Sequence, residues 1–150
     1  MTAQDNLVLT RSLLDLYNSH QSDPAWLDKS VAAFAADSTF TDIPSGRTLP
    51  GSEGYKQLVL FFVEAFPDSR IEQTNAFATE DQVVLEITGR GTNTGPLHLP
   101  TGDVPATGRS AEQRFCDVTQ FRNGKIVSFH IYYDLMTLLR QLGLVPAMGK

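Results

Sequence analysis

The sequence has little cysteine, little charge and no long hydrophobic run, and each absence excludes a class of protein. Its 150 residues include one cysteine, Cys116, which permits no internal disulfide and is typical of a reducing compartment. No run of about 18 apolar residues occurs, so no membrane-spanning helix is expected. The net charge of −5 disfavours binding to nucleic acid or to anionic membranes. The N-terminus lacks the basic and apolar regions of a signal peptide, so we expect a cytoplasmic protein.

Phenylalanine dominates the aromatic content. The chain has 9 Phe, 4 Tyr and 1 Trp, and 41% of its residues are hydrophobic. A chain of this length buries a core without needing disulfides or metals, and we expect one domain over residues 1–150. The phenylalanine rings are therefore expected to form an aromatic core or to line a pocket.

Hydrophobic periodicity divides the chain into a mainly helical first half and a second half of strands. We expect helices over 9–20, 24–34, 52–66 and 135–142, and strands over 38–43, 70–78, 82–90, 110–121 and 125–134. Asp23 and Pro24 are expected to begin the second helix, and Gly143 and Pro146 to end the last one. This order predicts an α+β domain in which a curved antiparallel sheet wraps around the N-terminal helices and encloses a pocket.

The last two predicted strands carry several polar residues that a hairpin would bring together. Asn123-Gly124 is a strong signal for a two-residue type I′ turn. That turn places Asp117 opposite His130, on the same face as Asp134, interleaved with the rings of Phe115 and Tyr132. Two carboxylates and an imidazole among aromatic rings are suited to proton transfer. A three-residue loop with a glycine bulge is the alternative, and it places Asp117 on the opposite face from His130.

The stretches FAADSTFTDIPSGRTLPGSEGYKQLVLFFVEAFPDSRIE, GRGTNTGPL and FRNGKIVSFHIYYDLMTLLRQLGLVP resemble the SnoaL-like polyketide cyclase and ester cyclase family. This family belongs to the nuclear transport factor 2-like superfamily. The resemblance implies a cone-shaped α+β fold, a deep apolar cavity, a homodimer and ring closure by intramolecular aldol condensation without metal or cofactor. It further implies that Asp134 is the acid/base. Many members carry a His where this sequence has Asn93, which we expect in the substrate site.

A second resemblance, to the ketosteroid isomerases of the same superfamily, covers three separate positions. Those enzymes place a Tyr on the first helix, an Asp base after the first strand and a second acid on a late strand. Tyr17, Asp42 and Asp117 lie at similar places. This resemblance implies that Asp42 is a base and Asp117 a hydrogen-bond donor to an oxyanion.

Each candidate residue also has a purely structural interpretation. Asp134 directly precedes a helix and could be its N-cap, and Asp42 could begin a turn. His130 could be a satisfied structural histidine, and Tyr17 either donates to an oxyanion or packs in the core. The remaining candidates either line the pocket or pack the core: Phe40, Phe115, Tyr132 and Trp26.

No cofactor or metal is expected. Residues 89–95 resemble a dinucleotide-binding motif but have one residue too many, and a proline follows instead of a helix. His20, His98 and His130 are too far apart for a metal site. Residues 91–108 read as a long loop that either covers a ligand with Leu97, His98 and Leu99 or is a plain surface loop.

These patterns favour a cofactor-independent acid/base enzyme acting on a hydrophobic carbonyl substrate. In this hypothesis Asp134 removes and returns the proton, His130 and Asp117 position the Asp134 carboxylate, and Tyr17 donates a hydrogen bond to the enolate oxygen. The alternatives are a ketosteroid-isomerase-like isomerase or dehydratase and a non-catalytic ligand-binding protein of the same fold. The expected partners are a hydrophobic small molecule and a second copy of the chain.

Overall fold

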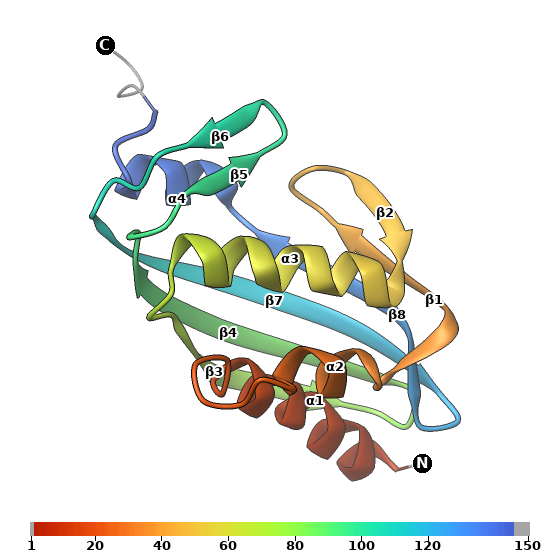
Figure 1. The fold of residues 1–150 in the computed structure, drawn as a ribbon. Coiled ribbons are helices and arrows are strands. Elements are labelled where there is room, and N and C mark those ends of the chain that lie inside the picture. The colour runs from red at the N-terminus through yellow and green to blue at the C-terminus, as the bar shows by residue number, and fades with distance from the viewer. Residues whose placement is uncertain (1, 146–150) are drawn as a thin grey trace.

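The computed structural model describes residues 2–145 of the chain (Figure 1). The four expected helices and five expected strands follow in the expected order, and three short strands that were not expected lie over 47–50, 97–99 and 102–104. The elements are α1 (Ala3–Tyr17), α2 (Trp26–Val31), β1 (Phe34–Asp42), β2 (Arg47–Pro50), α3 (Gly51–Ala65), β3 (Arg70–Ala78), β4 (Gln82–Thr92), β5 (Leu97–Leu99), β6 (Gly102–Val104), β7 (Ser110–Arg122), β8 (Lys125–Tyr133) and α4 (Leu135–Gln141). Gly143 follows the last helix with a φ of 73°, as expected for a helix C-terminus, and Pro146 lies outside the described residues.

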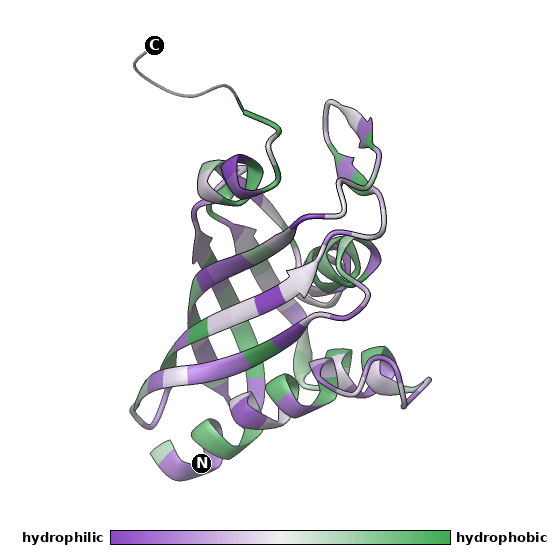
Figure 2. Cartoon of the chain, turned by 90° about the vertical axis from the view of Figure 1, so that its left-hand side faces the viewer, coloured by the Kyte–Doolittle hydropathy of each residue, from purple (hydrophilic) through white to green (hydrophobic). Residues whose placement is uncertain are grey.

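Six strands form one curved sheet in the order β2-β1-β8-β7-β4-β3, and the helices lie along one of its faces (Figures 1 and 2). The α+β class and the curved sheet are therefore confirmed. The expectation of a fully antiparallel sheet is wrong for one pair, because β1 and β8 run parallel. The sheet is therefore mixed, and the many elements between β1 and β8 supply the crossover that a parallel pair needs.

Helix α1 begins at a capping box. The Thr2 hydroxyl accepts a hydrogen bond from the Asp5 N–H at 3.1 Å, and the Asp5 carboxylate accepts from the Thr2 N–H at 2.9 Å. Along the helix, Thr10, Leu13 and Tyr17 recur at helical spacing and are buried. The apolar stripe expected from the sequence thus faces the interior and brings Tyr17 to the sheet.

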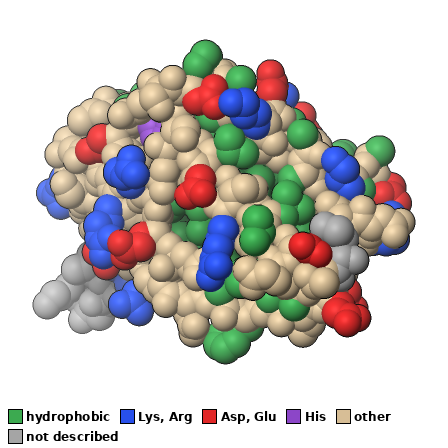
Figure 3. Space-filling model, turned by 90° about the horizontal axis from the view of Figure 1, so that it is seen from below, with side chains coloured by type: hydrophobic (Ala, Val, Ile, Leu, Met, Phe, Trp, Pro, Cys, Tyr) green, Lys and Arg blue, Asp and Glu red, His purple; other side chains and the backbone are tan. Residues whose placement is uncertain are grey.

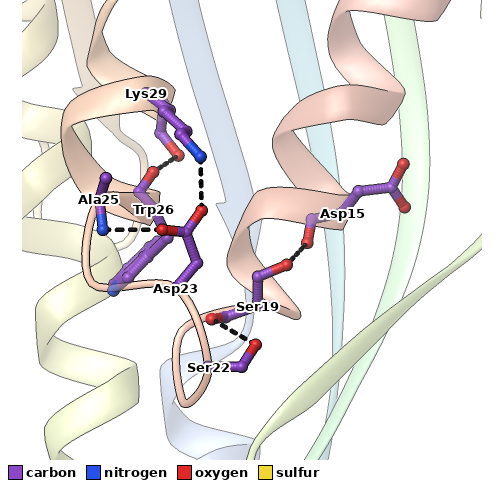
Figure 4. A network of polar contacts seen from close by, with 8 residues as sticks. Asp15, Ser19, Ser22, Asp23, Ala25, Trp26 and Lys29 are labelled. Carbon is purple, nitrogen blue, oxygen red and sulfur yellow. Dashed lines mark hydrogen bonds and ion pairs between the residues drawn. The ribbon is translucent and has the colours of Figure 1, made fainter.

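The connection from α1 to α2 is held by side chain to backbone hydrogen bonds (Figure 4). The Asp23 carboxylate accepts from the Ala25 N–H at 2.9 Å and pairs with Lys29 at 2.8 Å. Asp23 thus closes a local turn, and the helix begins two residues after Pro24, at Trp26. The turn aims Trp26 inward, where its ring meets that of Tyr17 edge-on with centroids 6.0 Å apart.

Helix α3 lies unusually close to β1. A Cβ at Gly54 would come within 2.6 Å of Phe40, so only glycine allows this approach. Phe40 in turn stacks on Phe129 of β8 with centroids 5.4 Å apart. The layer between α3 and the sheet is therefore closely packed at β1.

The buried apolar residues form two clusters. The larger lies between the sheet and α1 and α3, and the smaller joins α3 and α4 to the β5–β6 hairpin. The alternation of hydrophobic and hydrophilic residues along the strands is visible in Figure 2. On the face that carries α1, hydrophobic side chains are interspersed with charged ones (Figure 3).

Candidate functional site

A cavity lies in the larger cluster, between α1, α3 and the inner faces of β4, β7 and β8. Its volume is about 90 Å³, and its walls are mainly apolar. The lining residues from the helices are Thr10, Leu13, Leu14, Tyr17, Tyr55, Leu58, Val59, Phe62 and Leu138; those from the sheet include Leu85, Ile87, Gln113, Phe115, Asp117, Phe129 and Ile131. The expected apolar cavity is thus present, and few polar groups enter it.

Asp117 is the buried carboxyl group of this cavity. It lies in the middle of β7, paired with Leu85 on β4 and Ile131 on β8, and only 8% of its surface is exposed. Its Oδ1 is buried without a hydrogen-bond partner. Burial raises the pKa of Asp117 from 3.8 to about 7, because the apolar surroundings disfavour the charged form.

Two tyrosine hydroxyls accompany Asp117. The Tyr17 hydroxyl and the Ser69 hydroxyl share a hydrogen bond of 2.7 Å, and burial raises the pKa of Tyr17 to about 12. Burial also raises the pKa of Tyr55, and the nearby Asp117 carboxylate raises it further. Both phenols therefore stay neutral at ordinary pH and can donate hydrogen bonds inside the cavity.

The inner face of β7 runs from the surface into the cavity. Ala111, Gln113, Phe115 and Asp117 lie two residues apart and all line it. Ala111 also borders a polar surface groove, together with Arg90 of β4, so the groove and the cavity meet at this end. This end is the cavity entrance, and Asp117 lies at the opposite end of the row, farthest from it.

The predicted hairpin turn is correct, but the predicted register is wrong beyond its first pairs. Asn123 and Gly124 have φ angles of 52° and 75°, as a type I′ turn requires. A bulge then shifts the pairing, so that Asp117 faces Ile131 and His130 faces Val118. His130 therefore lies on the opposite face of the sheet from Asp117 and from the cavity.

Tyr132 follows His130 onto the outer face. Its side chain is 43% exposed and pairs with Cys116, so it does not line the pocket as expected. The ring that enters the cavity wall next to Phe115 is that of Phe62, with centroids 5.3 Å apart. Of the expected ring lining, Phe115 is in place and Tyr132 is not.

Asp134 lies outside the cavity, as an exposed N-cap of α4. Its carboxylate accepts a 3.1 Å hydrogen bond from the Thr137 N–H and a 2.6 Å bond from the Thr137 hydroxyl. These hydrogen bonds hold the pKa of Asp134 below its ordinary value. Asp134 therefore has neither the burial nor the raised pKa that an acid/base role requires. Its geometry is that of a helix N-cap, the structural role considered above.

Asp42 faces inward at the end of β1, beside Ile131 and in the same row across the sheet as Asp117. Its Oδ2 accepts from the Ser45 N–H at 3.2 Å, which is the expected turn contact. Its Oδ1 is buried without a hydrogen-bond partner. Burial raises the pKa of Tyr133, and the charge of the nearby Asp42 and its polar contact with the Tyr133 hydroxyl raise it further. Asp42 thus serves a turn and also presents a carboxylate oxygen to the interior, outside the cavity lining.

The other three predicted site residues belong to the framework. Phe40 and Trp26 pack in the core rather than in the cavity wall. Asn93 is fully buried: its Nδ2 donates to the carbonyls of Ala65 and Gly95, while its Oδ1 accepts from the Thr107 N–H and hydroxyl at 2.8 Å. With all its hydrogen-bonding capacity used, Asn93 anchors the following loop to α3.

The long loop expected over residues 91–108 contains the β5–β6 hairpin. Leu97 is fully buried in the smaller cluster, and His98 lies between Asp103 at 2.8 Å and Glu64 at 3.0 Å. The hydrogen bond to Asp103, aided by Glu64, raises the pKa of His98. The hairpin is therefore fastened to α3 and does not line the cavity as a lid.

Within residues 2–145, no group of three or more His, Cys, Asp or Glu residues is arranged to hold a metal ion. No helix among the described residues is long and apolar enough to cross a membrane.

Sequence reasoning missed several polar residues of the cavity, among them Gln113, Tyr55 and Ser69. Gln113 was signalled by its spacing of four residues from Asp117, which places both on one strand face. Tyr55 lies on an apolar helical stripe, where a phenol looks like core. Ser69 follows the end of α3 in an irregular segment, and no periodicity marks it.

Comparisons with known proteins agree with this architecture. A model of the SnoaL-like polyketide cyclase family matches residues 8–142. AclR from Streptomyces galilaeus, described as a candidate hydroxylase, is 22% identical over 99% of this chain and 91% of its own, with a TM-score of 0.79. A candidate SnoaL-like polyketide cyclase from Jannaschia sp. CCS1 is 19% identical over 97% of this chain and 96% of its own, with a TM-score of 0.82.

A third solved structure is IdmH from Streptomyces antibioticus, described as a candidate polyketide cyclase. It is 25% identical over 92% of this chain and 98% of its own, with a TM-score of 0.72. No curated protein matches the sequence. The structural likenesses show the nuclear transport factor 2-like fold.

Proposed function

The chain belongs to the SnoaL-like polyketide cyclase family, and we propose that it is a cofactor-independent acid/base enzyme for a hydrophobic, carbonyl-bearing substrate. The observation that supports this proposal is the Asp117 carboxyl, buried in an apolar cavity with Oδ1 unpartnered and with a pKa of about 7. A carboxyl group with this pKa populates both protonation states at neutral pH. It can therefore take a proton and later return it.

In the proposed reaction, ionised Asp117 removes a proton from a carbon that lies between two carbonyl groups. The electron pair of the broken C–H bond moves onto a carbonyl oxygen, and the Tyr17 or Tyr55 hydroxyl donates a hydrogen bond to this enolate oxygen. The enolate carbon then attacks a third carbonyl group, farther along the same molecule, so a C–C bond forms as the π bond of that C=O group breaks. Neutral Asp117 returns its proton to the resulting alkoxide, which completes an aldol ring closure.

This proposal moves the proton-transfer role from Asp134 to Asp117. A general base needs an environment that brings its pKa toward the working pH, and an apolar cavity does this by desolvation. Asp134 is exposed, and hydrogen bonds from Thr137 lower its pKa. Its position instead fits stabilisation of α4.

The test is proton exchange at carbon. The probe is 2-tetralone, a bicyclic ketone, and the exchange of its α protons for deuterium is followed by proton NMR. Asp117→Asn is expected to slow the protein-catalysed exchange by about 10²–10⁴-fold, the usual contribution of a positioned base. Asp134→Asn is the matched control and should keep the wild-type rate. An Asp117→Asn variant with the wild-type exchange rate would contradict the proposal.

A double-bond isomerase is the second candidate, and one observation favours it. Asp42 and Asp117 lie in one inner row on either side of Ile131, each with a buried, unpartnered Oδ1. In this version Asp42 is the base and neutral Asp117 donates to the oxyanion. Asp42→Asn would then abolish exchange, whereas it leaves the rate unchanged if Asp117 is the base.

A non-catalytic ligand-binding protein is the third candidate. It requires Asp134 to be an exposed cap, which is the geometry observed. It also predicts that no variant of Asp117 affects proton exchange, because the wild type would then have no activity above buffer.

For the assembly we propose a homodimer, as the family resemblance implies, and light scattering in solution tests it.

A further inference from the structure

Two hydrogen-bond acceptors without partners lie on the same wall of the cavity. They are Gln113 Oε1 and Asp117 Oδ1, both on the inner face of β7 with the Phe115 ring between them. Gln113 is 6% exposed, so bulk water does not satisfy its oxygen. Buried polar groups are nearly always hydrogen-bonded, and a group that is not calls for an explanation.

The orientation of the Gln113 amide follows from its single hydrogen bond. Its Nε2 donates to the Arg114 carbonyl at 3.1 Å. Only the NH₂ group can donate to a carbonyl, so Oε1 is the atom that remains free. The cavity thus offers an acceptor at Gln113, and a donor would have to come from a ligand.

The neighbouring strand carries no side chain opposite Gln113. Gly89 of β4 is paired with Gln113, and Gly91 with Ala111, and both glycines line the cavity. A Cβ at Gly91 would lie 2.9 Å from Phe66 and 3.2 Å from Ser69, so the glycine lets the chain that follows α3 pack closely on β4 at this end. The wall beside Gln113 is therefore backbone at these two positions, and neither glycine has a side chain that could pair with the Gln113 oxygen.

The spacing along β7 sets the separation of the two acceptors. Gln113 and Asp117 are four residues apart, which is about 13–14 Å along an extended strand. Both side chains lie on the inner face of β7, and the Phe115 side chain lies between them. A flat ring system is the shape that reaches both ends while lying against this ring.

We propose that Gln113 Oε1 accepts a hydrogen bond from a hydroxyl or N–H group of the substrate, at the end of a flat ring system that points toward the cavity entrance. This inference rests on the proposed function, since it assigns a second contact in the same site. The substrate class is then a polycyclic or ring-closing carbonyl compound with a donor at one end and the acidic C–H group at Asp117. A substrate lacking the donor leaves the buried oxygen unpaired and is rejected.

The test measures affinity rather than turnover, with three naphthalenes of one shape: 2,6-dihydroxynaphthalene, 6-methoxy-2-naphthol and 2,6-dimethoxynaphthalene. Calorimetry gives their dissociation constants. In the wild type, each replacement of a hydroxyl by a methoxy group should weaken binding by up to about tenfold, the net effect of one hydrogen bond. Gln113→Met removes the amide at nearly the same volume, and Gln120→Met on the outer face of β7 is the matched control.

Gln113→Met is expected to bind the diol up to about tenfold more weakly and to lose the preference for the diol over the monomethyl ether. Gln120→Met should behave as the wild type. Gln113→Asn, which withdraws the amide by one methylene, gives the same loss if Gln113→Met does not fold. The inference is overturned if the Gln113 variants keep the wild-type preference, or if the wild type has none. Failure of the proposed function would instead appear as a wild-type rate of proton exchange in Asp117→Asn.

Discussion

Replacing Asp117 by Asn should change how the stability of the protein depends on pH. Burial raises the pKa of this carboxyl from 3.8 to about 7 in the folded state. The folded protein therefore binds more protons than the unfolded chain between these two values, and the contribution of Asp117 to stability falls as pH rises through that window. Below about pH 4 both states are protonated, and above about pH 7 both are ionised, so the contribution is constant outside the window.

The magnitude follows from the change in pKa. From 3.8 to about 7 the pKa rises by about 3, and at 1.36 kcal/mol for each pKa unit this corresponds to about 4 kcal/mol. Asparagine has a similar shape and does not titrate. The difference in unfolding free energy between Asp117→Asn and the wild type should therefore grow in favour of the variant by up to about 4 kcal/mol between pH 4 and pH 8.

Urea unfolding of both proteins at closely spaced pH values measures this difference. Other titrating groups contribute equally to the two proteins and cancel in the comparison, which is the reason for subtracting one curve from the other. The expected curve is flat at low pH, rises through the window and is flat again above it. A difference that stays constant from pH 4 to pH 8 would refute the raised pKa and with it the basis for assigning proton transfer to Asp117.

Three other changes should have distinct effects. Asp134→Ala removes the cap of α4 and should lower the unfolding free energy by about 0.5–2 kcal/mol in urea unfolding, without slowing proton exchange. The stabilising contribution of His98 should be lost as pH rises through its raised pKa, because protonated His98 pairs with Glu64 and Asp103; His98→Gln lacks this contribution, so its melting temperature should fall less with pH than that of the wild type. Gly91→Ala should lower the unfolding free energy by about 1–3 kcal/mol in urea unfolding, because its Cβ would lie 2.9 Å from Phe66 and 3.2 Å from Ser69 and one of them would have to shift.

The sequence was sufficient to predict the helices and the five long strands, because helical and strand periodicities are local properties, but the three short strands β2, β5 and β6 span too few residues to show a period. It was not sufficient for the register of the β7–β8 hairpin, although the turn at Asn123 and Gly124 was predicted correctly. Ile126 and Phe129 are both buried, yet they are three residues apart and cannot share a face of a regular strand. The extra residue at the bulge resolves this conflict, and the cost of exposing either apolar side chain decides the register.

That one-residue shift also decides which of the candidate residues enter the cavity. It turns His130 to the outer face and pairs Asp117 with Ile131 on the inner one. The odd spacing of Ile126 and Phe129 was available in the sequence as a signal for a bulge. The position of Asp134 was not decided by spacing in this way, because a residue between a strand and a helix can turn either toward the core or toward the first turn of the helix.

Two buried side-chain amides show how structural and functional roles can be told apart. Asn93 is fully buried, and both atoms of its amide are hydrogen-bonded to the surrounding chain, so it contributes to folding and has nothing left to offer a ligand. Gln113 is almost as deeply buried, but its Oε1 has no partner and the residue lines a cavity. An apolar side chain of the same volume would avoid that cost. Gln113 and Asp117 both weaken the fold in this way on one wall of one cavity, and a ligand that pairs with them is the physical explanation common to both.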